Sequence, residues 1–452
     1  MSYKSNKDIS GLHFAHFTTQ SFLFSFITQF LSLLVGIVTA RILGPTGKGI
    51  VAIVILYPTL LLTLGHLSVY RALTVRIGEK KYLFADYPGT TMALTVFSSI
   101  CLMAIFIVVY FVFNRIFIQG VDFYVILISL FILPCSMIMQ NFSSILQAKS
   151  RIREFNIIKV IQASSLLFMV IIVLLLLHLG TNGVVFAYLF SNLCAGITAI
   201  YFVKKIDFQR WKINVFLLKE LLSDGIKIHI GVIASFICLR IDMFMLASYR
   251  QTNNVGFYSI AVSMAELLMI IPLAIQGVFY SKVSEAINDR LILRERTVAV
   301  YKHSLFLLLL ASIVFALLAR PIIRLFYGDI FLPSILPFMI LLPGLFYMWL
   351  NNALTSYLIG MKRFFVVSSI STIAAILNVC LNIIFIPSYG AAGAALASTI
   401  TYILIGTLTL TAFFITSKYN VGDFIKSVQF TKNDLKLYQI VIRRFLWIRD
   451  KP

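Results

Sequence analysis

IHIGVIASFICLRIDMFMLASYRQTNNVGFYSIAVSMAELLMIIPLAIQGVFY, residues 228–280, is the stretch that decides the fold. Two apolar spans flank a polar turn at residues 250–254, and each is long enough to cross about 30 Å of hydrocarbon at roughly 1.5 Å per residue. Arg240 and Asp242 nevertheless lie near the middle of the first span, and Glu266 lies near the middle of the second. A charge facing lipid at that depth costs about 2.5–3.5 kcal/mol. The hairpin is therefore predicted to form the wall of a polar lumen.

The composition is that of a polytopic helical membrane protein. The chain is 60% hydrophobic and 12% charged, with a mean hydropathy of +0.96, whereas soluble proteins are about 45–50% apolar and 25% charged. The net charge of +21 does not indicate a nucleic-acid partner, because the Lys and Arg residues gather between the apolar spans. The five Cys residues lie in apolar segments without a CxxC pair, so neither disulfides nor a metal site are expected.

Twelve transmembrane spans are predicted, which puts both termini on one side of the membrane. Of the 38 Lys and Arg residues, 31 fall in the termini and the even-numbered loops, six fall in the odd-numbered loops, and Arg240 is intramembrane. The positive-inside rule therefore predicts cytoplasmic N- and C-termini. The spans are expected at residues 18–40, 50–70, 91–113, 122–146, 158–178, 183–203, 228–249, 255–280, 303–319, 333–358, 364–387 and 392–416.

Weak internal repeats divide the spans into two halves. Three pairs of segments recur in order with shifts of 207, 212 and 210 residues: 40–49 with 247–256, 146–151 with 358–363, and 182–187 with 392–397. Two six-span halves inserted in the same sense are parallel repeats, and a substrate path between them is expected. This predicts an all-α fold with an N-terminal lobe (1–203), a cytoplasmic linker (204–227), a C-terminal lobe (228–416) and a basic tail (417–452).

Two interfacial pieces are predicted outside the spans. Residues 215–222 form a short amphipathic run in the linker, and the tail places Leu435, Tyr438, Ile442 and Phe445 on one helical face. Such a helix suits an anionic leaflet of the lipid bilayer. A solvated basic tail remains an equal alternative.

The segment from Ile376 to Pro387, which contains Asn378 and Asn382, is followed by residues 390–395, GAAGAA. It resembles the paired-Asn, Ile-Pro, Gly-Ala-Ala hallmark of bacterial polysaccharide-export flippases. These are the Wzx-type, PST-family members of the MOP exporter superfamily. Residues 40–45, ARILGP, with Gly49 resemble the first loop of the same family.

This resemblance implies two six-helix lobes in a V shape that work by alternating access. It also implies the substrate, an undecaprenyl-pyrophosphate-linked oligosaccharide repeat unit of O-antigen (hence lipopolysaccharide), capsule or exopolysaccharide. The repeat unit would move from the inner to the outer leaflet of the bacterial cytoplasmic membrane, and polysaccharide polymerase machinery would be a partner.

The charged residues inside the membrane are the candidate lumen and substrate-binding residues. Arg240 and Asp242 are two residues apart and do not share a helix face, so Arg240 is expected to pair with Glu266 across the hairpin. In one hypothesis Arg240 contacts the pyrophosphate or sugar, and Asp242 or Glu266 responds to an H⁺ or Na⁺ gradient. The other is a structural ion pair, and both remain open.

Further candidates lie at the span ends and in the paired-Asn block. Arg41, at the outer end of span one, and Arg71, at the inner end of span two, are either snorkelling anchors or lumen residues. Asn378 and Asn382 share a face and are expected to hydrogen-bond between helices. His66 is expected to be a core histidine with satisfied hydrogen bonds rather than a proton carrier.

Two other functions fit the sequence less well. A cation-coupled drug antiporter of the related MATE family is the alternative transporter, and the Asn378 block disfavours it. An O-antigen polymerase or ligase would need a large outer loop with catalytic residues, whereas the outer loops here are short and lack carboxylate or His clusters. The chain is therefore not expected to be an enzyme, and no catalytic residue, metal site or cofactor is predicted.

Overall fold

A computed structural model describes residues 2–112, 122–206, 210–249, 252–272, 290–431 and 434, with side chains from residue 23 onward except 228 and 290. These residues contain helices and no β-strand. The first part of the chain forms α1 (Ser2–Gly65), α2 (Val69–Glu79), α3 (Asp86–Val112), α4 (Phe123–Leu130), α5 (Ile132–Ala148), α6 (Ile152–Ile171), the π-helix η1 (Ile172–Leu176) and α7 (Gly180–Ile206). The second part forms α8 (Val215–Ser248), α9 (Thr252–Glu266), η2 (Leu267–Met269), α11 (Arg290–Phe326), η3 (Asp329–Ser334), α12 (Ile335–Leu350), α13 (Asn352–Gly360), α14 (Phe364–Ser417) and α15 (Val421–Val428).

The predicted number of twelve crossings is confirmed once two sharp bends are taken into account. Ten helices in the described ranges are long and apolar enough to cross a membrane. Two of these, Leu23–Gly65 with 43 residues and Phe364–Ser417 with 54, are too long for one crossing, and each contains one non-helical glycine. Gly44 has φ 67° and Gly390 has φ 54°, a region that glycine enters without a Cβ clash. Each helix therefore has two arms and crosses twice.

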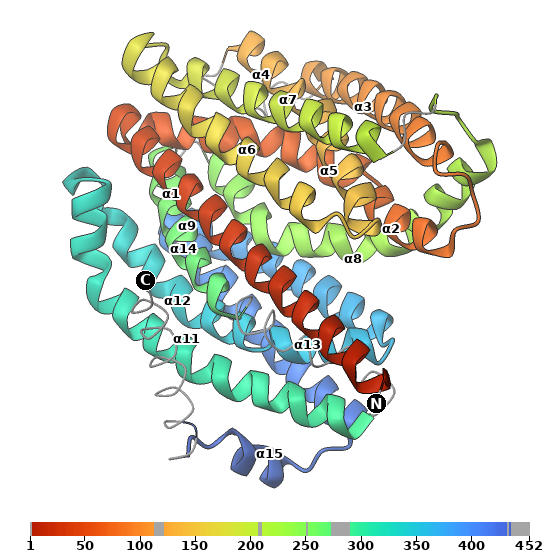
Figure 1. Cartoon of the computed structure of the whole chain (residues 1–452). Helices are drawn as coiled ribbons and strands as arrows, with labels where there is room; N and C mark the ends of the chain where they lie inside the picture. The colour runs from red at the N-terminus through yellow and green to blue at the C-terminus, as the bar shows by residue number, and fades with distance from the viewer. Residues whose placement is uncertain are drawn as a thin grey trace, which may run out of the picture.

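Figure 1 shows the first of these bends directly, because the red helix α1 runs to the upper left and then turns back. We call residues 2–43 and 45–65 the first and second arms of α1. Residues 364–389 and 391–417 are the first and second arms of α14. Gly393, three residues after the Gly390 bend, packs against the first arm so closely that a Cβ would overlap the Phe385 carbonyl oxygen. The two arms of α14 therefore pack tightly against each other at Gly393.

The predicted end of span two was wrong because hydropathy does not detect a helix break inside a largely apolar run. Span two does not run to residue 70, since α1 ends at Gly65 and Leu67 and Ser68 have positive φ values of 46° and 53° before α2 begins. Much of the predicted linker is helix, because α8 starts at Val215 and continues into span seven. Asn214 caps that start, and its side chain accepts from the backbone N–H groups of residues 216 and 217 at 3.1 and 3.2 Å.

The helices form two lobes. In one lobe α7 packs on α5 and α6, and α2 and α3 pack on α5; in the other, α14 packs on α8, α12 and α13, and α11 packs on α12. Figure 1 shows these groups one above the other, with α8 and the first arm of α1 between them. Contacts between the groups run from α1 to α9 and from α2 and α3 to α8. The lobe boundaries at residues 203 and 228 stay predictions.

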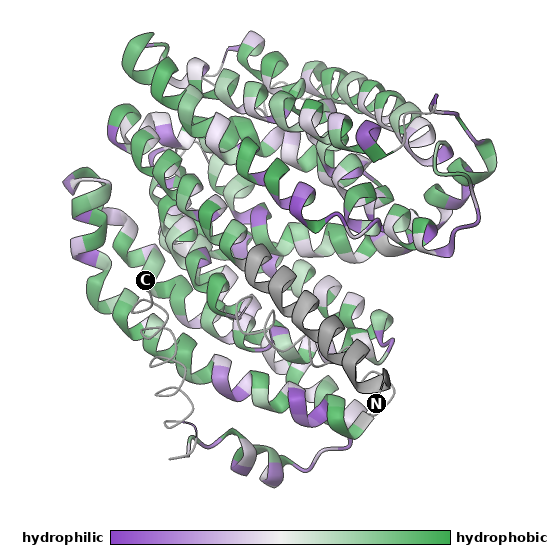
Figure 2. Cartoon of the chain, viewed as in Figure 1, coloured by the Kyte–Doolittle hydropathy of each residue, from purple (hydrophilic) through white to green (hydrophobic). Residues whose placement is uncertain are grey.

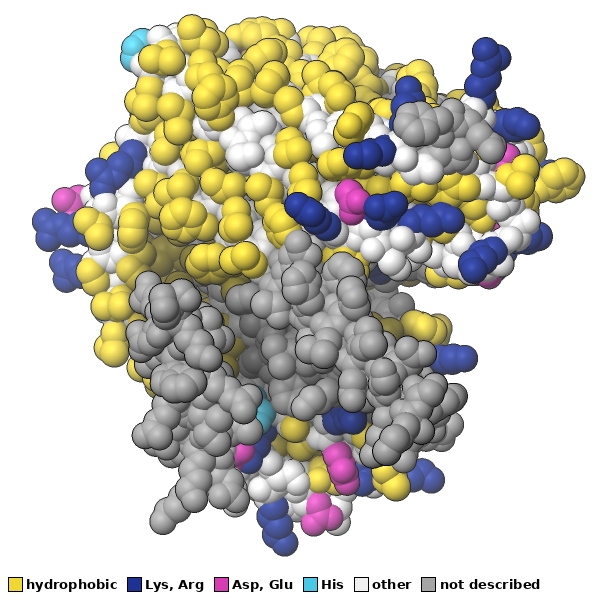
Figure 3. Space-filling view, viewed as in Figure 1, with side chains coloured by type: hydrophobic (Ala, Val, Ile, Leu, Met, Phe, Trp, Pro, Cys, Tyr) yellow, Lys and Arg dark blue, Asp and Glu magenta, His cyan; other side chains and the backbone are white. Residues whose placement is uncertain are grey.

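The exterior is that of a multi-pass membrane protein. Large apolar side chains such as Phe97, Leu176 and Leu317 are exposed by 70%, 71% and 75%, and soluble proteins rarely expose contiguous apolar surface of this extent. Figure 2 shows green, apolar helices over most of both lobes and purple, hydrophilic residues around α2 and on α11 and α15. Figure 3 shows the same apolar face in yellow over the upper lobe, with Lys and Arg at its edges.

The basic tail is described only in part. Helix α15 buries Phe424 and exposes Val421 and Ile425. The predicted apolar face at Leu435, Tyr438, Ile442 and Phe445 lies outside the described residues, as do residues 273–280 of the opening hairpin.

Candidate functional site

Arg240 and Glu266 form an ion pair between α8 and α9. The Nη2 atom of Arg240 lies 3.1 Å from Oε1 of Glu266, and the side chains are 31% and 32% exposed. A charged pair in the middle of a span reduces the cost that either charge would have alone in hydrocarbon. Because both side chains remain partly accessible, the pair can be approached by a ligand.

Asp242 is only two residues from Arg240 but lies in a different environment. It is 1% exposed, and its Oδ1 accepts from the backbone N–H of Met243 at 2.7 Å. Its Oδ2 accepts from the Tyr258 hydroxyl and, at 2.9 Å, from the Ser398 hydroxyl. Asp242 therefore joins α8, α9 and the second arm of α14, and in this conformation it does not line an accessible surface.

Asn378 and Asn382 continue this buried polar region. Asn378 Nδ2 donates to Thr401 Oγ1 at 3.3 Å, and Asn382 Nδ2 donates to Asn378 Oδ1 at 2.9 Å. Both Asn side chains are fully buried. Thr401 lies one helical turn from Ser398 on the second arm of α14, so the hydrogen bonds of Asn378 and Asp242 end on neighbouring turns of one helix.

The two arms of α1 meet the other lobe near Gly44, an end of the molecule that we call the Gly44 end. Here a Cβ on Gly49 would overlap the Thr252 carbonyl oxygen, and a Cβ on Gly256 would overlap the Pro45 carbonyl oxygen. The backbones of α1 and α9 approach this closely because neither glycine has a side chain. The repeat segments 40–49 and 247–256, found from sequence, are thus in direct contact.

Arg41 adds a second contact at the Gly44 end. Its Nε donates to the Phe326 carbonyl oxygen at 2.8 Å, and its Nη2 donates to the Leu325 carbonyl oxygen. These carbonyls belong to the last turn of α11, where a cation is favoured by the helix dipole. Arg41 therefore ties the first arm of α1 to the end of α11, rather than acting only as an anchor to the membrane surface.

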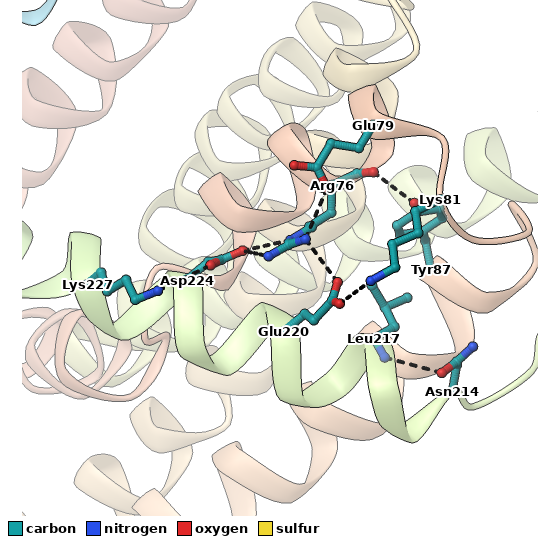
Figure 4. A network of polar contacts seen from close by, with 9 residues as sticks. All are labelled: Arg76, Glu79, Lys81, Tyr87, Asn214, Leu217, Glu220, Asp224 and Lys227. Atoms are coloured by element: carbon teal, nitrogen blue, oxygen red, sulfur yellow. Dashed lines mark hydrogen bonds and ion pairs between the residues drawn. The ribbon is translucent and has the colours of Figure 1, made fainter. Parts of the chain in front are cut away.

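The opposite end of the molecule, which we call the α2 end, contains an ionic network that the sequence did not reveal (Figure 4). Arg76 on α2 lies 3.0 Å from both Glu79 and Glu220, and 2.6 Å from Asp224. Lys81 lies 2.5 Å from Glu220. The hydrogen bond from Lys81 lowers the pKa of Glu220, and the hydrogen bond to Asp224 raises the pKa of Arg76. The start of α8 is thereby fixed to α2.

Arg71 lies on the same helix but outside this network. Its side chain is exposed, and its Nε donates to the Tyr70 hydroxyl at 2.9 Å. The five predicted lumen residues therefore fall in three places: Arg41 at the Gly44 end, Arg71 at the α2 end, and the remaining three residues between them. The structure brings Arg240 and Glu266 together and places Asp242 behind them.

An apolar groove of about 420 Å³ runs between α8 and the first arm of α14. Its α8 side is formed by residues 230, 233, 234 and 237, which recur at helical spacing, and the next position on that face is Arg240. The groove is lined by Ile230, Ile233, Ala234, Ile237, Thr372, Ala375, Ile376, Val379 and Cys380. It can take an apolar chain, and its last α8 residue, Ile237, lies about one helical turn before Arg240.

This fold is similar to that of solved membrane flippases and transporters. Among solved structures, the lipid II flippase MurJ in an inward closed conformation matches with a TM-score of 0.75 and 16% identity, covering 96% of this chain and 93% of MurJ. An inward-facing multidrug resistance MATE family transporter matches with a TM-score of 0.70 and 16% identity, covering 86% and 94%. An outward-facing MATE family transporter has a TM-score of 0.63 and 16% identity, covering 90% and 96%.

A family model that matches the sequence shows the family. The family described as "Polysaccharide biosynthesis protein" matches residues 18–286, which is more than half of the chain. The chain therefore belongs to this family, and the resemblance to PST-family exporters is confirmed. No curated protein matches the sequence.

Proposed function

We propose that the protein is a flippase for polyprenyl-pyrophosphate-linked oligosaccharide repeat units of a surface polysaccharide. The observation that carries this proposal is the apolar groove on α8, which ends about one helical turn before the ion-paired Arg240. An isoprenoid chain is apolar and a pyrophosphate is anionic, so a groove followed by an accessible guanidinium matches both parts of such a lipid. Membership of a polysaccharide biosynthesis family supports the same substrate class.

In this proposal the pyrophosphate takes the place of Glu266 as the partner of Arg240. A guanidinium binds phosphate oxygens through charge-assisted, often bidentate hydrogen bonds, which are about twice as strong as neutral ones. The partly exposed ion pair would hold Arg240 in position until the substrate arrives. Export of an intact repeat unit then needs only rearrangement of contacts and no covalent step.

Alternating access would occur between the Gly44 end and the α2 end. The Gly44 end is closed in this structure. Under the positive-inside rule, the Lys- and Arg-rich segments support a cytoplasmic position for the α2 end. The higher TM-score with the inward-facing than with the outward-facing MATE structure supports a cytoplasm-facing state. The substrate would enter from the inner leaflet of a bacterial cytoplasmic membrane and leave for polymerase machinery on the outer side.

Coupling to an H⁺ or Na⁺ gradient is proposed at the carboxylates behind Arg240. Asp242 is buried among hydroxyl and amide groups, and Glu266 is the partner that substrate binding would release. A cation that binds when Glu266 is released would compensate its charge. Binding of the substrate and binding of the cation would then be linked thermodynamically.

The test is deletion of the gene in its host, followed by extraction of polyprenyl-linked saccharides. We expect complete repeat units to accumulate on the inner leaflet and the surface polymer to be lost, and their mass would identify the sugars. The similarity to MATE transporters supplies the alternative, a cation-coupled drug antiporter. Normal surface polymer with increased sensitivity to cationic drugs would favour that alternative and reject the flippase.

A further inference from the structure

His66 is a buried histidine whose ring has no hydrogen-bond partner among the described residues. It directly follows α1 and precedes the positive-φ residues Leu67 and Ser68, where the helix breaks before α2. The side chain is 4% exposed and its ring packs edge-on against Tyr70, with centroids 4.8 Å apart. Neither ring nitrogen has a partner. The expectation of a satisfied core histidine is therefore wrong, and a buried imidazole with two unpaired nitrogens requires another ligand.

Two cavities adjoin His66, a larger one with a mixed polar and apolar lining and a smaller one that is mainly apolar. The larger, of about 100 Å³, is lined by Leu62, Thr63, His66, Ser68, Tyr70, Gln140, His229 and Val232. The smaller, of about 20 Å³, is lined by Gly65, His66, Leu67, Val69, Leu94, Thr95, Ser98, Met137, Asn141 and Leu222. Asn141 Oδ1 is also buried without a partner. A cavity needs about 10–15 Å³ of such space to hold a water, so the smaller cavity has room for one. At about 30 Å³ per water in the liquid, the larger cavity has room for about three.

His229 on α8 closes the larger cavity and is itself satisfied. Its Nε2 lies 3.0 Å from the Leu64 carbonyl oxygen, which can only accept, so Nε2 donates. Its Nδ1 then accepts from the Ser68 hydroxyl, 3.3 Å away. His229 therefore holds the turn between α1 and α2, whereas His66 keeps both nitrogens available for water.

No carboxylate is among the residues that line the two cavities, so a protonated His66 ring would be stabilised by water. Of the residues lining the two cavities, the titratable ones are His66, His229 and Tyr70; α3 and α5 contribute the neutral polar residues Thr95, Ser98, Gln140 and Asn141. On α2, Arg71 donates to the Tyr70 hydroxyl. Farther along α2 and α8, Arg76 and Lys227 pair with Asp224.

We propose that His66 and the two cavities form a hydrated proton-binding site at the α2 end of the protein. One ring nitrogen takes a proton from cavity water, and the aqueous phase at the α2 end replaces that proton. The imidazolium then donates through one water to Asn141 Oδ1 and through another to the polar lining of the larger cavity. No other bond forms or breaks in this step.

The position of His229 makes occupancy of this site depend on conformation. His229 lies on α8, whose start is fixed to α2 by the Arg76 network and whose later turns pack on α14 in the other lobe. If α8 moves relative to the turn at Ser68, the larger cavity opens and proton affinity changes, so pH and lobe movement are linked. This consequence rests on the proposed transport function, whereas the proton site itself does not.

The proton site is tested directly by nuclear magnetic resonance on full-length protein in lipid nanodiscs, with ¹⁵N-labelled histidine. The His66 signals are assigned by their loss in His66→Gln, or by their shift in Asn141→Ala if the first variant does not fold. Burial lowers the pKa of the His66 imidazole to about 4, so we expect the ring to exchange magnetisation with water and to titrate between about pH 3 and 5. A His66 ring that contacts no water, or keeps one protonation state across this range, would overturn the proposal.

A second experiment measures flipping of a fluorescent polyprenyl-pyrophosphate monosaccharide in proteoliposomes at several pH values. A step limited by one proton changes up to about tenfold per pH unit, and we expect His66→Gln to weaken that dependence, the remainder coming from the carboxylates behind Arg240. His178→Gln, at an exposed turn, is the matched control and should retain it. Equal pH dependence in His66→Gln and the wild type would refute the link to transport. No flipping by the wild type at any pH would reject the flippase function while the magnetic resonance titration still decides the proton site.

Discussion

Gly49 and Gly256 make a reciprocal contact: each lies against the backbone carbonyl of the residue that is four positions before the other. The partners are Thr252 and Pro45, which are related by the same 207-residue shift as the two glycines. The contact therefore has the isologous character of a two-fold symmetric interface, although it joins two repeats of one chain. The Thr46 hydroxyl, which donates to Asn253 Oδ1 at 2.5 Å, joins another pair with this shift.

Replacing Gly256 by Leu is expected to prevent closure at the Gly44 end. A side chain there would overlap backbone, which cannot rotate away, and overpacking costs about 1–3 kcal/mol. This would shift the equilibrium away from the closed state by roughly 5–150-fold. Thiol labelling of Asn253→Cys in liposomes should then become faster.

The control for this substitution is Gly78→Leu, since a Cβ at Gly78 would meet nothing within 4 Å. Gly78→Leu should label at the wild-type rate. Unchanged labelling in Gly256→Leu would mean that the glycine contact does not control closure.

A disulfide between Thr46→Cys and Asn253→Cys is expected to trap the closed state. The two side chains are in hydrogen-bond contact, so mild oxidation should link them. Transport in proteoliposomes should fall at least about tenfold and recover on reduction, because alternating access requires this contact to open. Each single Cys variant is the control for oxidation of the native cysteines. Full transport by the cross-linked protein would exclude opening at this end.

Arg240 and Glu266 can be assigned to function or to structure by a double substitution. Arg240→Ala alone leaves the Glu266 carboxylate unpaired, and we expect lower accumulation together with loss of transport. Adding Glu266→Ala removes the unpaired charge and should restore accumulation. If Arg240 binds pyrophosphate, transport by the double variant stays reduced by at least about 100-fold, the loss of a charge-assisted bond worth about 3 kcal/mol.

The measurement for this pair is substrate flipping per folded molecule. Arg240→Lys keeps the charge but loses the bidentate geometry, so an intermediate rate is expected. Recovery of both accumulation and transport in the double variant would assign the pair a purely structural role.

The sequence predicted the membrane crossings and the pseudo-symmetry but not where the halves touch. Segment 40–49 and its repeat were found because the motif recurs, and the separate spans 364–387 and 392–416 agree with the bend at Gly390. The partner of Arg41 could not be predicted, because the carbonyls at the end of α11 lie 285 residues away and carry no side-chain signal. Tertiary packing decides such a contact.

The buried polar residues were likewise predicted only in part from the sequence. Asp242 and Arg240 look equivalent in sequence, since both are charges in one apolar span, yet the helix turns one inward and leaves the other accessible. His66 looks like an ordinary core residue until the cavities beside it are seen. The amphipathic run at residues 215–222 was predicted, but its continuity with span seven in one helix was not, because the charged residues between them lower hydropathy without breaking a helix.

The network at the α2 end is expected to make stability depend on acid pH. The folded-state pKa of Glu220 lies below its ordinary value of 4.5, chiefly through the hydrogen bond from Lys81. The stabilisation is therefore fully present above the unfolded-state pKa and is lost as pH falls through the folded-state pKa. Below about pH 4.5, the Tm of the detergent-solubilised protein should fall by on the order of 1–3 °C more in the wild type than in Glu220→Gln, as measured by thermal unfolding.

The matched control is Glu154→Gln, which removes an ion pair of 3.2 Å within one exposed helix turn and should leave the wild-type pH slope nearly intact. The same slope in wild type and Glu220→Gln would show that the connection of α2 to α8 does not depend on this carboxylate, and that packing alone holds the start of α8 in place.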